Sequence, residues 1–155
     1  MSQELLRHTL ATVAYRAARA LRNAPPEFAS YRADAGSRTP AQILAHMGDL
    51  FDWALSNANG KQTWHNSEPL EWDREVARFY ATLAAFDQRL ASAEPIYATA
   101  EQLFQGPIAD AINHVGQLAM LRRMAGCPAG GENFYVADIA IGRVTLEQPA
   151  PRREF

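Results

Sequence analysis

The stretch PIADAINHVGQLAMLRRMAG, residues 107–126, decides the fold class of this chain. Pro107 suits the first turn of a helix, and the two arginines and the glycine at the other end suit a last turn and its stop. A second, polar stripe of Asp110, His114 and Gln117 follows the same helical spacing. The apolar face beside it comprises Ile108, Ala111, Ile112, Val115, Leu118 and Ala119. We therefore expect this helix to carry both core residues and chemistry.

Three further amphipathic helices are predicted before it. The first runs from a Ser2 cap to about residue 23, the second from Thr39-Pro40 to about residue 60, and the third over about residues 70–91. Residues 93–105 form a connector whose second half we expect to contain a short helix. The predicted apolar faces are Leu5, Leu6, Leu10, Val13, Ala17, Ala20 and Leu21; Ile43, Leu44, Met47, Leu50, Phe51, Ala54 and Leu55; and Val76, Phe79, Tyr80, Leu83, Phe86 and Leu90.

Four such helices without a competing set of strands predict an all-α fold, an antiparallel or crossover four-helix bundle. We expect one domain over residues 1–155, with an extended tail of about residues 129–155 laid over the bundle. The connections between the first and second helices and between the third and fourth are long for bundle loops. One or both are therefore expected to cross the end of the bundle.

Composition narrows the class of protein. The 155 residues suffice for one domain with a real core. A formal net charge of −2 argues against a basic nucleic-acid-binding surface. The only cysteine, Cys127, allows no internal disulfide, and the N-terminal region lacks the apolar run of a signal peptide. No segment is apolar enough for a membrane span. We therefore expect a cytoplasmic protein.

No phosphate-binding, zinc-protease or serine-hydrolase motif is present, whereas the spacing of the histidines suggests a metal site. Asp110 and His114 stand four residues apart, so their side chains project from one side of a helix. His46, on or beside the buried face of the second helix, is the candidate third ligand from a facing helix. Two imidazoles and one carboxylate with open positions suit zinc, nickel or iron.

The same residues have simpler interpretations. Asp110 suits the first turn of a helix, His114 could bond Asp110 directly, and His46 could bond a backbone carbonyl. Gln117, one turn after His114, either hydrogen-bonds and orients that ligand or is an interior amide that bonds another neighbour. Asp49 is an alternative carboxylate ligand, although a solvated position suits it better. The sequence is therefore compatible both with a metal site and with a buried hydrogen-bond cluster.

A histidine within AQILAHMGDL and the motif HVGQLAMLRR resemble the DinB-like (DNA-damage-inducible, DinB/YfiT-like) family of four-helix bundles. The resemblance covers nearly the whole chain in helix order. In that family a histidine of the second helix and an HxxxH pair ending in HxGQ bind a divalent metal. His46 and His114 match two of these positions, and Gly116 and Gln117 complete HxGQ. This sequence has Asp110 where the family has the first histidine of the HxxxH pair. The difference affects the expected metal affinity, the preferred ion and the activity.

The resemblance implies a metal-dependent transferase or isomerase that uses a low-molecular-weight thiol and an electrophilic substrate. Many members form dimers through bundle helices, so a homodimer is an expectation that the sequence itself does not decide. The alternative is a non-catalytic, stress-related binding or structural bundle. A catalytic site requires an open cleft over the three side chains, which we expect near residues 93–105, whereas a structural cluster would be sealed by Phe51 or Met120.

Overall fold

The chain is all-helical in a computed structural model that describes residues 1–155. The long helices are α1 (Gln3–Leu21), α2 (Pro40–Ala58), α3 (Trp72–Ala91) and α5 (Ala109–Met124), and α4 (Ala100–Leu103) is a single turn. Short 3₁₀ turns cover Pro26–Ser30 and Phe134–Val136. None of the helices combines the length and apolar character that crossing a membrane demands.

Local side-chain chemistry fixes where α1 and α2 begin. The Ser2 hydroxyl accepts from the backbone N–H of Leu5, as an N-cap does. Thr39 and Gln42 form a reciprocal capping box at the start of α2, with Pro40 in the first turn. Both predicted helix starts are confirmed.

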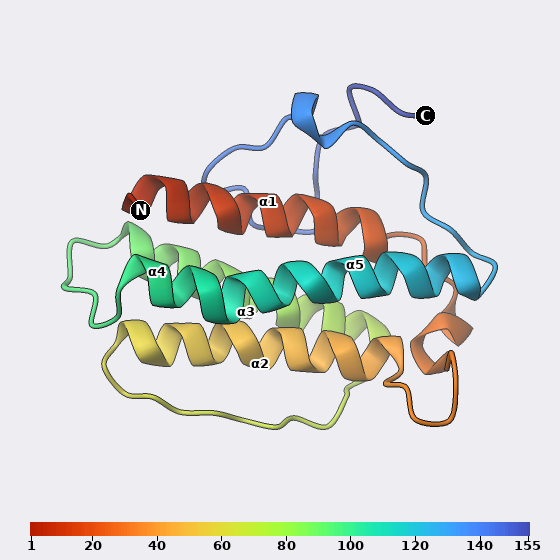
Figure 1. Cartoon of the computed structure of the whole chain (residues 1–155), viewed down its shortest axis with the longest axis horizontal. Helices are drawn as coiled ribbons and strands as arrows, with labels where there is room; N and C mark the ends of the chain where they lie inside the picture. The colour runs from red at the N-terminus through yellow and green to blue at the C-terminus, as the bar shows by residue number, and fades with distance from the viewer.

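Each long helix packs against two of the other three (Figure 1). The pairs are α1 with α3, α3 with α2, α2 with α5, and α5 with α1. Arg78 bonds Ala45 and Arg89 bonds Asn59, so α2 and α3 run in the same direction. By contrast, Arg7 bonds Asp87 and the Tyr80 hydroxyl donates to the carbonyl of Ala14, so α1 runs antiparallel to α3.

The connection that crosses the molecule joins α2 to α3. The segment 59–71 leaves one end of α2 and returns along its side to the other end before α3 starts (Figure 1). In the cyclic packing order α1 and α2 are not neighbours, and neither are α3 and α5, so the two connections expected to cross an end of the helix array do cross it. The lengthwise course of segment 59–71 is an addition that the sequence analysis did not predict. This segment places Trp64 and Ser67 against α2, where Trp64 contacts His46 and Ser67 bonds Asp49.

The core lies between the four long helices, and most predicted apolar residues are in it. Fully buried aromatic side chains at its centre include Phe51, Phe79 and Phe86. Three predicted core positions are wrong: Leu5, Ile112 and Ala119 are exposed. The exposed apolar residues of α5, Ile112, Met120 and Met124, lie on a face that no other part of the chain covers.

The helix of residues 107–126 begins earlier than predicted. Thr99 and Gln102 form a capping box, α4 follows, and a π-helical segment, Phe104–Ile108, joins α4 directly to α5 (Figure 1). Pro107 therefore lies inside the helix instead of in its first turn. The wider π turn accommodates a residue that lacks an N–H donor, which an α-helix interior does not tolerate well. The predicted short helix in the connector is confirmed.

The tail is extended, as predicted, and passes over α1 (Figure 1). Its one ladder contact is an isolated bridge between Glu132 and Glu154. Phe134 packs edge-on against Tyr15, and the Arg16 guanidinium stands 4.1 Å from the Phe134 ring centroid. Val144 is buried in the common core, so the tail contributes to the packing of the helices.

Candidate metal centre

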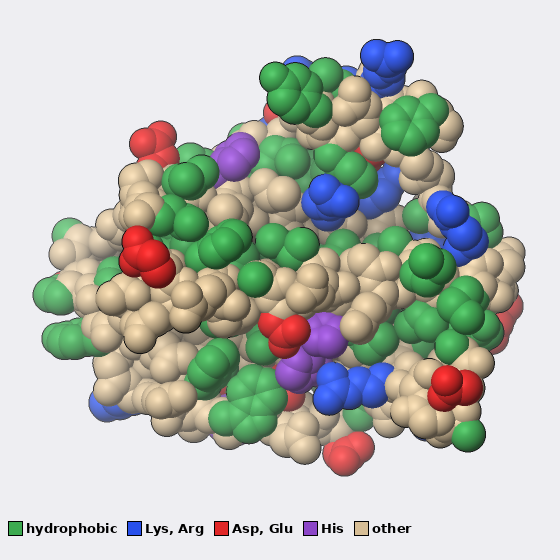
Figure 2. All heavy atoms as spheres, viewed as in Figure 1, with side chains coloured by type: hydrophobic (Ala, Val, Ile, Leu, Met, Phe, Trp, Pro, Cys, Tyr) green, Lys and Arg blue, Asp and Glu red, His purple; other side chains and the backbone are tan.

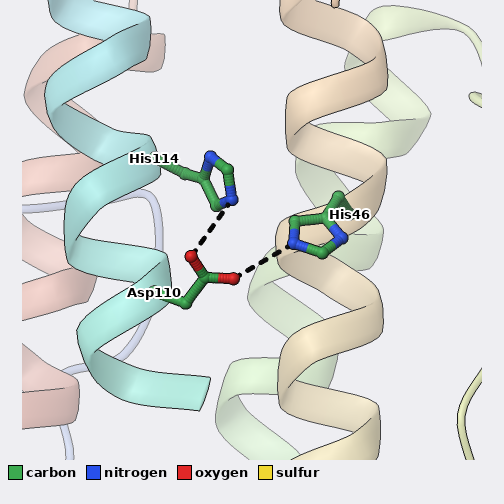
Figure 3. Close-up of side chains that lie close together, drawn as sticks. All are labelled: His46, Asp110 and His114. Atoms are coloured by element: carbon green, nitrogen blue, oxygen red, sulfur yellow. Dashed lines mark hydrogen bonds and ion pairs between the residues drawn. The ribbon is translucent and has the colours of Figure 1, made fainter. Parts of the chain in front are cut away.

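His46, Asp110 and His114 converge between α2 and α5 (Figure 3). The His46 Nε2 atom is 3.2 Å from Asp110 Oδ2, and the His114 Nε2 atom is 3.4 Å from Asp110 Oδ1. One ligand atom from each residue lies within 4.8 Å of the other two. The structure therefore brings together all three residues that the sequence analysis selected.

Backbone geometry explains the convergence. Asp110 and His114 are one turn apart on α5, so both side chains leave the helix on one side. α2 packs against α5 and presents His46 to that side. The π-helical segment ends at Ile108, directly before this turn, and so sets which face of α5 turns toward α2.

Gln117 determines how the His114 ring uses its two nitrogens. The His114 Nδ1 atom is 2.7 Å from Gln117 Oε1, and a hydrogen bond to this acceptor oxygen requires the proton to be on Nδ1. In the neutral ring the other nitrogen, Nε2, then holds a lone pair, and this nitrogen faces Asp110. Two acceptors face each other at 3.4 Å unless a cation lies between them or a second proton makes the ring an imidazolium. The predicted orienting role of Gln117 fits this geometry.

The donor set fits a divalent ion. Donors about 2.0–2.1 Å from a tetrahedral zinc are separated by about 3.3 Å. The two carboxylate–imidazole distances, 3.2 Å to Oδ2 and 3.4 Å to Oδ1, are close to that length, and the three donor atoms lie within 4.8 Å of one another. No lysine or arginine is paired with Asp110, so its charge is available to an ion. Imidazole nitrogen and carboxylate oxygen suit zinc, nickel or iron, and His46, Asp110 and His114 would hold it.

The cluster is open to solvent. The side chains of His114, His46 and Asp110 are 11%, 19% and 45% exposed. Figure 2 shows histidine side chains beside an acidic one at the surface on this face of the molecule. Phe51 is fully buried elsewhere in the core and Met120 is 59% exposed, so neither side chain seals the cluster. This observation favours an accessible site over a sealed hydrogen-bond cluster.

Two clefts meet at the cluster. The larger, about 680 Å³, includes His114, Gln117 and Met120 in its wall, and the smaller, about 270 Å³, includes His46. Arg38 lines both. The expected entrance near residues 93–105 is wrong, because that connector contributes to neither cleft. The loop before α2 and the segment 66–69 form the rims instead.

Trp64 is a neighbour of the site that the sequence analysis did not select. Its ring packs edge-on against His46 with centroids 5.6 Å apart, and Trp53 packs against Trp64 in the same way at 6.0 Å. The His46 and His114 rings are themselves edge-on at 4.8 Å. No spacing signal in the sequence connects residue 64 to the helices, since the crossing segment alone brings it there.

Asp49 belongs to a different cluster. It is 2% exposed and accepts hydrogen bonds from Ser67 and from the Arg78 guanidinium, so its predicted solvated position is wrong. Arg78 also bonds both Glu75 and the carbonyl of Ala45. Burial lowers the pKa of Arg78, but the hydrogen bonds and charges of Glu75 and Asp49 outweigh it and raise the pKa overall. With its oxygens occupied, Asp49 is no alternative ligand.

Comparisons with known proteins give no relative on which to base a function: no protein-family model, no curated protein and no solved structure matches this chain.

Proposed function

We propose that this chain is a DinB-like four-helix-bundle metalloprotein, and that it catalyses a metal-dependent transfer or isomerisation with a low-molecular-weight thiol. The observation that carries the proposal is the convergence of His46, Asp110 and His114, from two helices, at an open surface. The cyclic packing of four long helices and the crossing segment between α2 and α3 are consistent with a bundle of this kind.

The residues of the chain have separate tasks in this proposal. His46, Asp110 and His114 hold a zinc, nickel or iron ion, and Gln117 keeps the lone pair of His114 directed toward it. A bound divalent ion supplies Lewis acidity that stabilises a thiolate at neutral pH. The Trp64 ring restrains His46 and excludes water from one side of the site. The larger cleft, walled partly by Ile43, Met120 and Leu121, has room for the reacting groups.

The transfer reaction is a substitution at an electrophilic carbon. The thiol loses its proton to solvent, its sulfur forms a bond to that carbon, and a leaving group departs with the bonding electrons. Asn113 and Gln117 line the cleft and offer polar groups that would orient such a substrate beside His114.

An activity assay tests this function. The protein is loaded separately with zinc, nickel or iron(II) and mixed with a small thiol and 1-chloro-2,4-dinitrobenzene. We expect at least one ion to give a rate above that of the thiol alone, a His46→Ala variant to lose it, and a His65→Ala variant to keep it. His65 is a matched control because its side chain is exposed, bonds Asp52 and lines neither cleft. Bound metal without turnover of any thiol would contradict the catalytic role.

One observation favours a second candidate, a non-catalytic binding bundle. Asp110 replaces the imidazole that the resembling family has at this position, and its carboxylate is within hydrogen-bond distance of His46. The contacts of His46 and His114 with Asp110 would then hold α2 against α5. Failure to bind any divalent ion would favour this candidate.

A homodimer is part of the proposal. Ile112 and Met124 expose apolar surface on α5 outside the cleft, and a second copy of α5 would cover it. Light scattering coupled to size-exclusion chromatography tests it, with a mass of two chains expected for the native protein and of one chain for a Met124→Glu variant.

A further inference from the structure

Arg38 is the one charged side chain in the larger cleft beside the metal centre. The other residues of that cleft are neutral or a histidine, among them Ile43, Asn113, His114 and Gln117. Arg38 is exposed and makes no hydrogen bond or ion pair with any carboxylate, unlike Arg7, Arg19 and Arg78. Its charge is therefore free to act on a molecule that enters the cleft.

The position of Arg38 is fixed by the start of α2. It directly precedes Thr39, which the capping box holds in place, so its backbone is anchored while its side chain is free. The same side chain also lines the smaller cleft, which contains His46. Arg38 therefore lines both clefts beside the cluster: the larger one, which contains His114, and the smaller one, which contains His46.

The two clefts differ in charge. The smaller cleft contains Asp49 and Glu68 as well as Arg38, so acidic groups there oppose a negatively charged ligand. The larger cleft contains no acidic residue. An anionic group would therefore be accepted in the larger cleft, whose volume of about 680 Å³ is typical of small-molecule sites.

We propose that Arg38 binds the carboxylate of a thiol substrate whose sulfur reaches the His46–Asp110–His114 ion, so that the protein selects anionic thiols. This assignment rests on the proposed function. A guanidinium presents two parallel N–H donors that match a carboxylate, whereas no other group in the cleft carries a positive charge. Arg38 thus determines which thiol is accepted, and the three ligands determine where it reacts.

A matched pair of thiols tests the assignment. The protein is loaded with cobalt(II), and binding of 3-mercaptopropionate and of uncharged 3-mercapto-1-propanol is followed by the visible absorption of the ion. We expect the carboxylate-bearing thiol to bind at least tenfold more tightly to the wild type. Arg38→Gln should remove this preference by weakening 3-mercaptopropionate alone, and Arg38→Lys should restore part of it.

Arg74→Gln provides the control, because Arg74 is an exposed arginine on α3 that has no ion pair and lines neither cleft. It should leave both affinities unchanged. Equal affinities of the two thiols for the cobalt-loaded wild type, or equal losses for both in Arg38→Gln, would overturn the Arg38 assignment alone. A wild type that gives no cobalt absorption would overturn the metal site and the assignment with it.

Discussion

Two polar clusters share α2, and they balance their charge differently. Asp49 and His46 are three residues apart on this helix, yet Asp49 faces Arg78 and Glu75 while His46 faces Asp110 and His114. In the first cluster every carboxylate oxygen accepts a hydrogen bond, and a guanidinium lies between the two acids. In the second, one carboxylate meets two imidazoles and no arginine or lysine.

The difference separates a structural cluster from a site. Asp49 and Glu75 are 2% and 0% exposed, so their charges have to be balanced by the chain itself. The Asp110 side chain is 45% exposed and can be balanced from solution, by protons or by an ion. The first cluster should therefore matter most to stability, and the second to the binding of a cation.

Arg78→Met should give the largest effect, because it leaves two buried carboxylates without their cation. We expect a loss of about 3–5 kcal/mol in the free energy of unfolding, measured by urea denaturation. Arg74→Met, an exposed position on the same helix, should change it by less than about 0.5 kcal/mol. Similar losses of unfolding free energy in the two variants would contradict the structural role of the cluster around Arg78.

Zinc should stabilise the folded protein through the second cluster. At a free concentration one hundred times the dissociation constant, a ligand of the native state adds about 2.7 kcal/mol to the free energy of unfolding. We expect this gain in the wild type and in His65→Ala, reversed by a chelator, and none in His46→Ala. A gain that survives in His46→Ala would show that zinc binds elsewhere.

The pair of Tyr15 and Glu132 is intermediate between the two clusters, because only one oxygen of the buried Glu132 carboxylate accepts a hydrogen bond. The Tyr15 hydroxyl donates to Glu132 Oε2 at 2.7 Å, while Glu132 Oε1 accepts no hydrogen bond and has only the Arg19 Nε atom 3.7 Å away. Burial, then the bond to Glu132, raises the pKa of Tyr15 from 10.0 to about 12. The neutral phenol is thus favoured in the folded state.

This pKa difference predicts a loss of stability at high pH. The folded pKa lies above the unfolded one, so the contribution is complete below pH 10 and falls as the pH rises toward 12. From about 1.4 kcal/mol per pKa unit we expect the wild type to lose about 2 kcal/mol more than Tyr15→Phe between pH 9 and 12. Urea denaturation at several pH values measures it, and parallel pH profiles of the two proteins would contradict it.

Two glycines give the smallest effects, with opposite signs. A Cβ at Gly48 would lie 2.9 Å from the Arg78 Nη2 atom, which is bonded to Ala45 and Glu75, whereas a Cβ at Gly116 would meet nothing within 4 Å. Gly116→Ala should stabilise by up to about 1 kcal/mol through helix propensity. Gly48→Ala should destabilise by about 1 kcal/mol despite the same gain, because a hydrogen bond to a charged group contributes about 1.5–3 kcal/mol. Two stabilising substitutions would mean that Arg78 moves freely.

Much of the fold could be predicted because its signals are local. Ser2 and the Thr39-Pro40 pair mark helix starts by hydrogen bonds within one turn. The interior position of Pro107 could not be read from the sequence, since a π turn removes the usual penalty of a missing donor. Nor does the length of segment 59–71 reveal that it crosses the molecule.

The candidate site shows the same division. Asp110 and His114 follow from an i, i+4 spacing, and His46 from the rule that facing helices share a metal site. The burial of Asp49 depends on Arg78, 29 positions away on another helix, and the contact of Trp64 with His46 depends on the path of a loop. No spacing within one helix encodes either contact.

The metal content of the protein tests the central claim most directly. Wild type, His114→Ala and His65→Ala are purified without a histidine tag, dialysed against zinc, nickel or iron(II), freed of excess ion and analysed by elemental mass spectrometry. The account predicts one divalent ion per chain in the wild type and in His65→Ala, and none in His114→Ala. A wild type without bound metal after loading, or equal metal in His114→Ala, would contradict it.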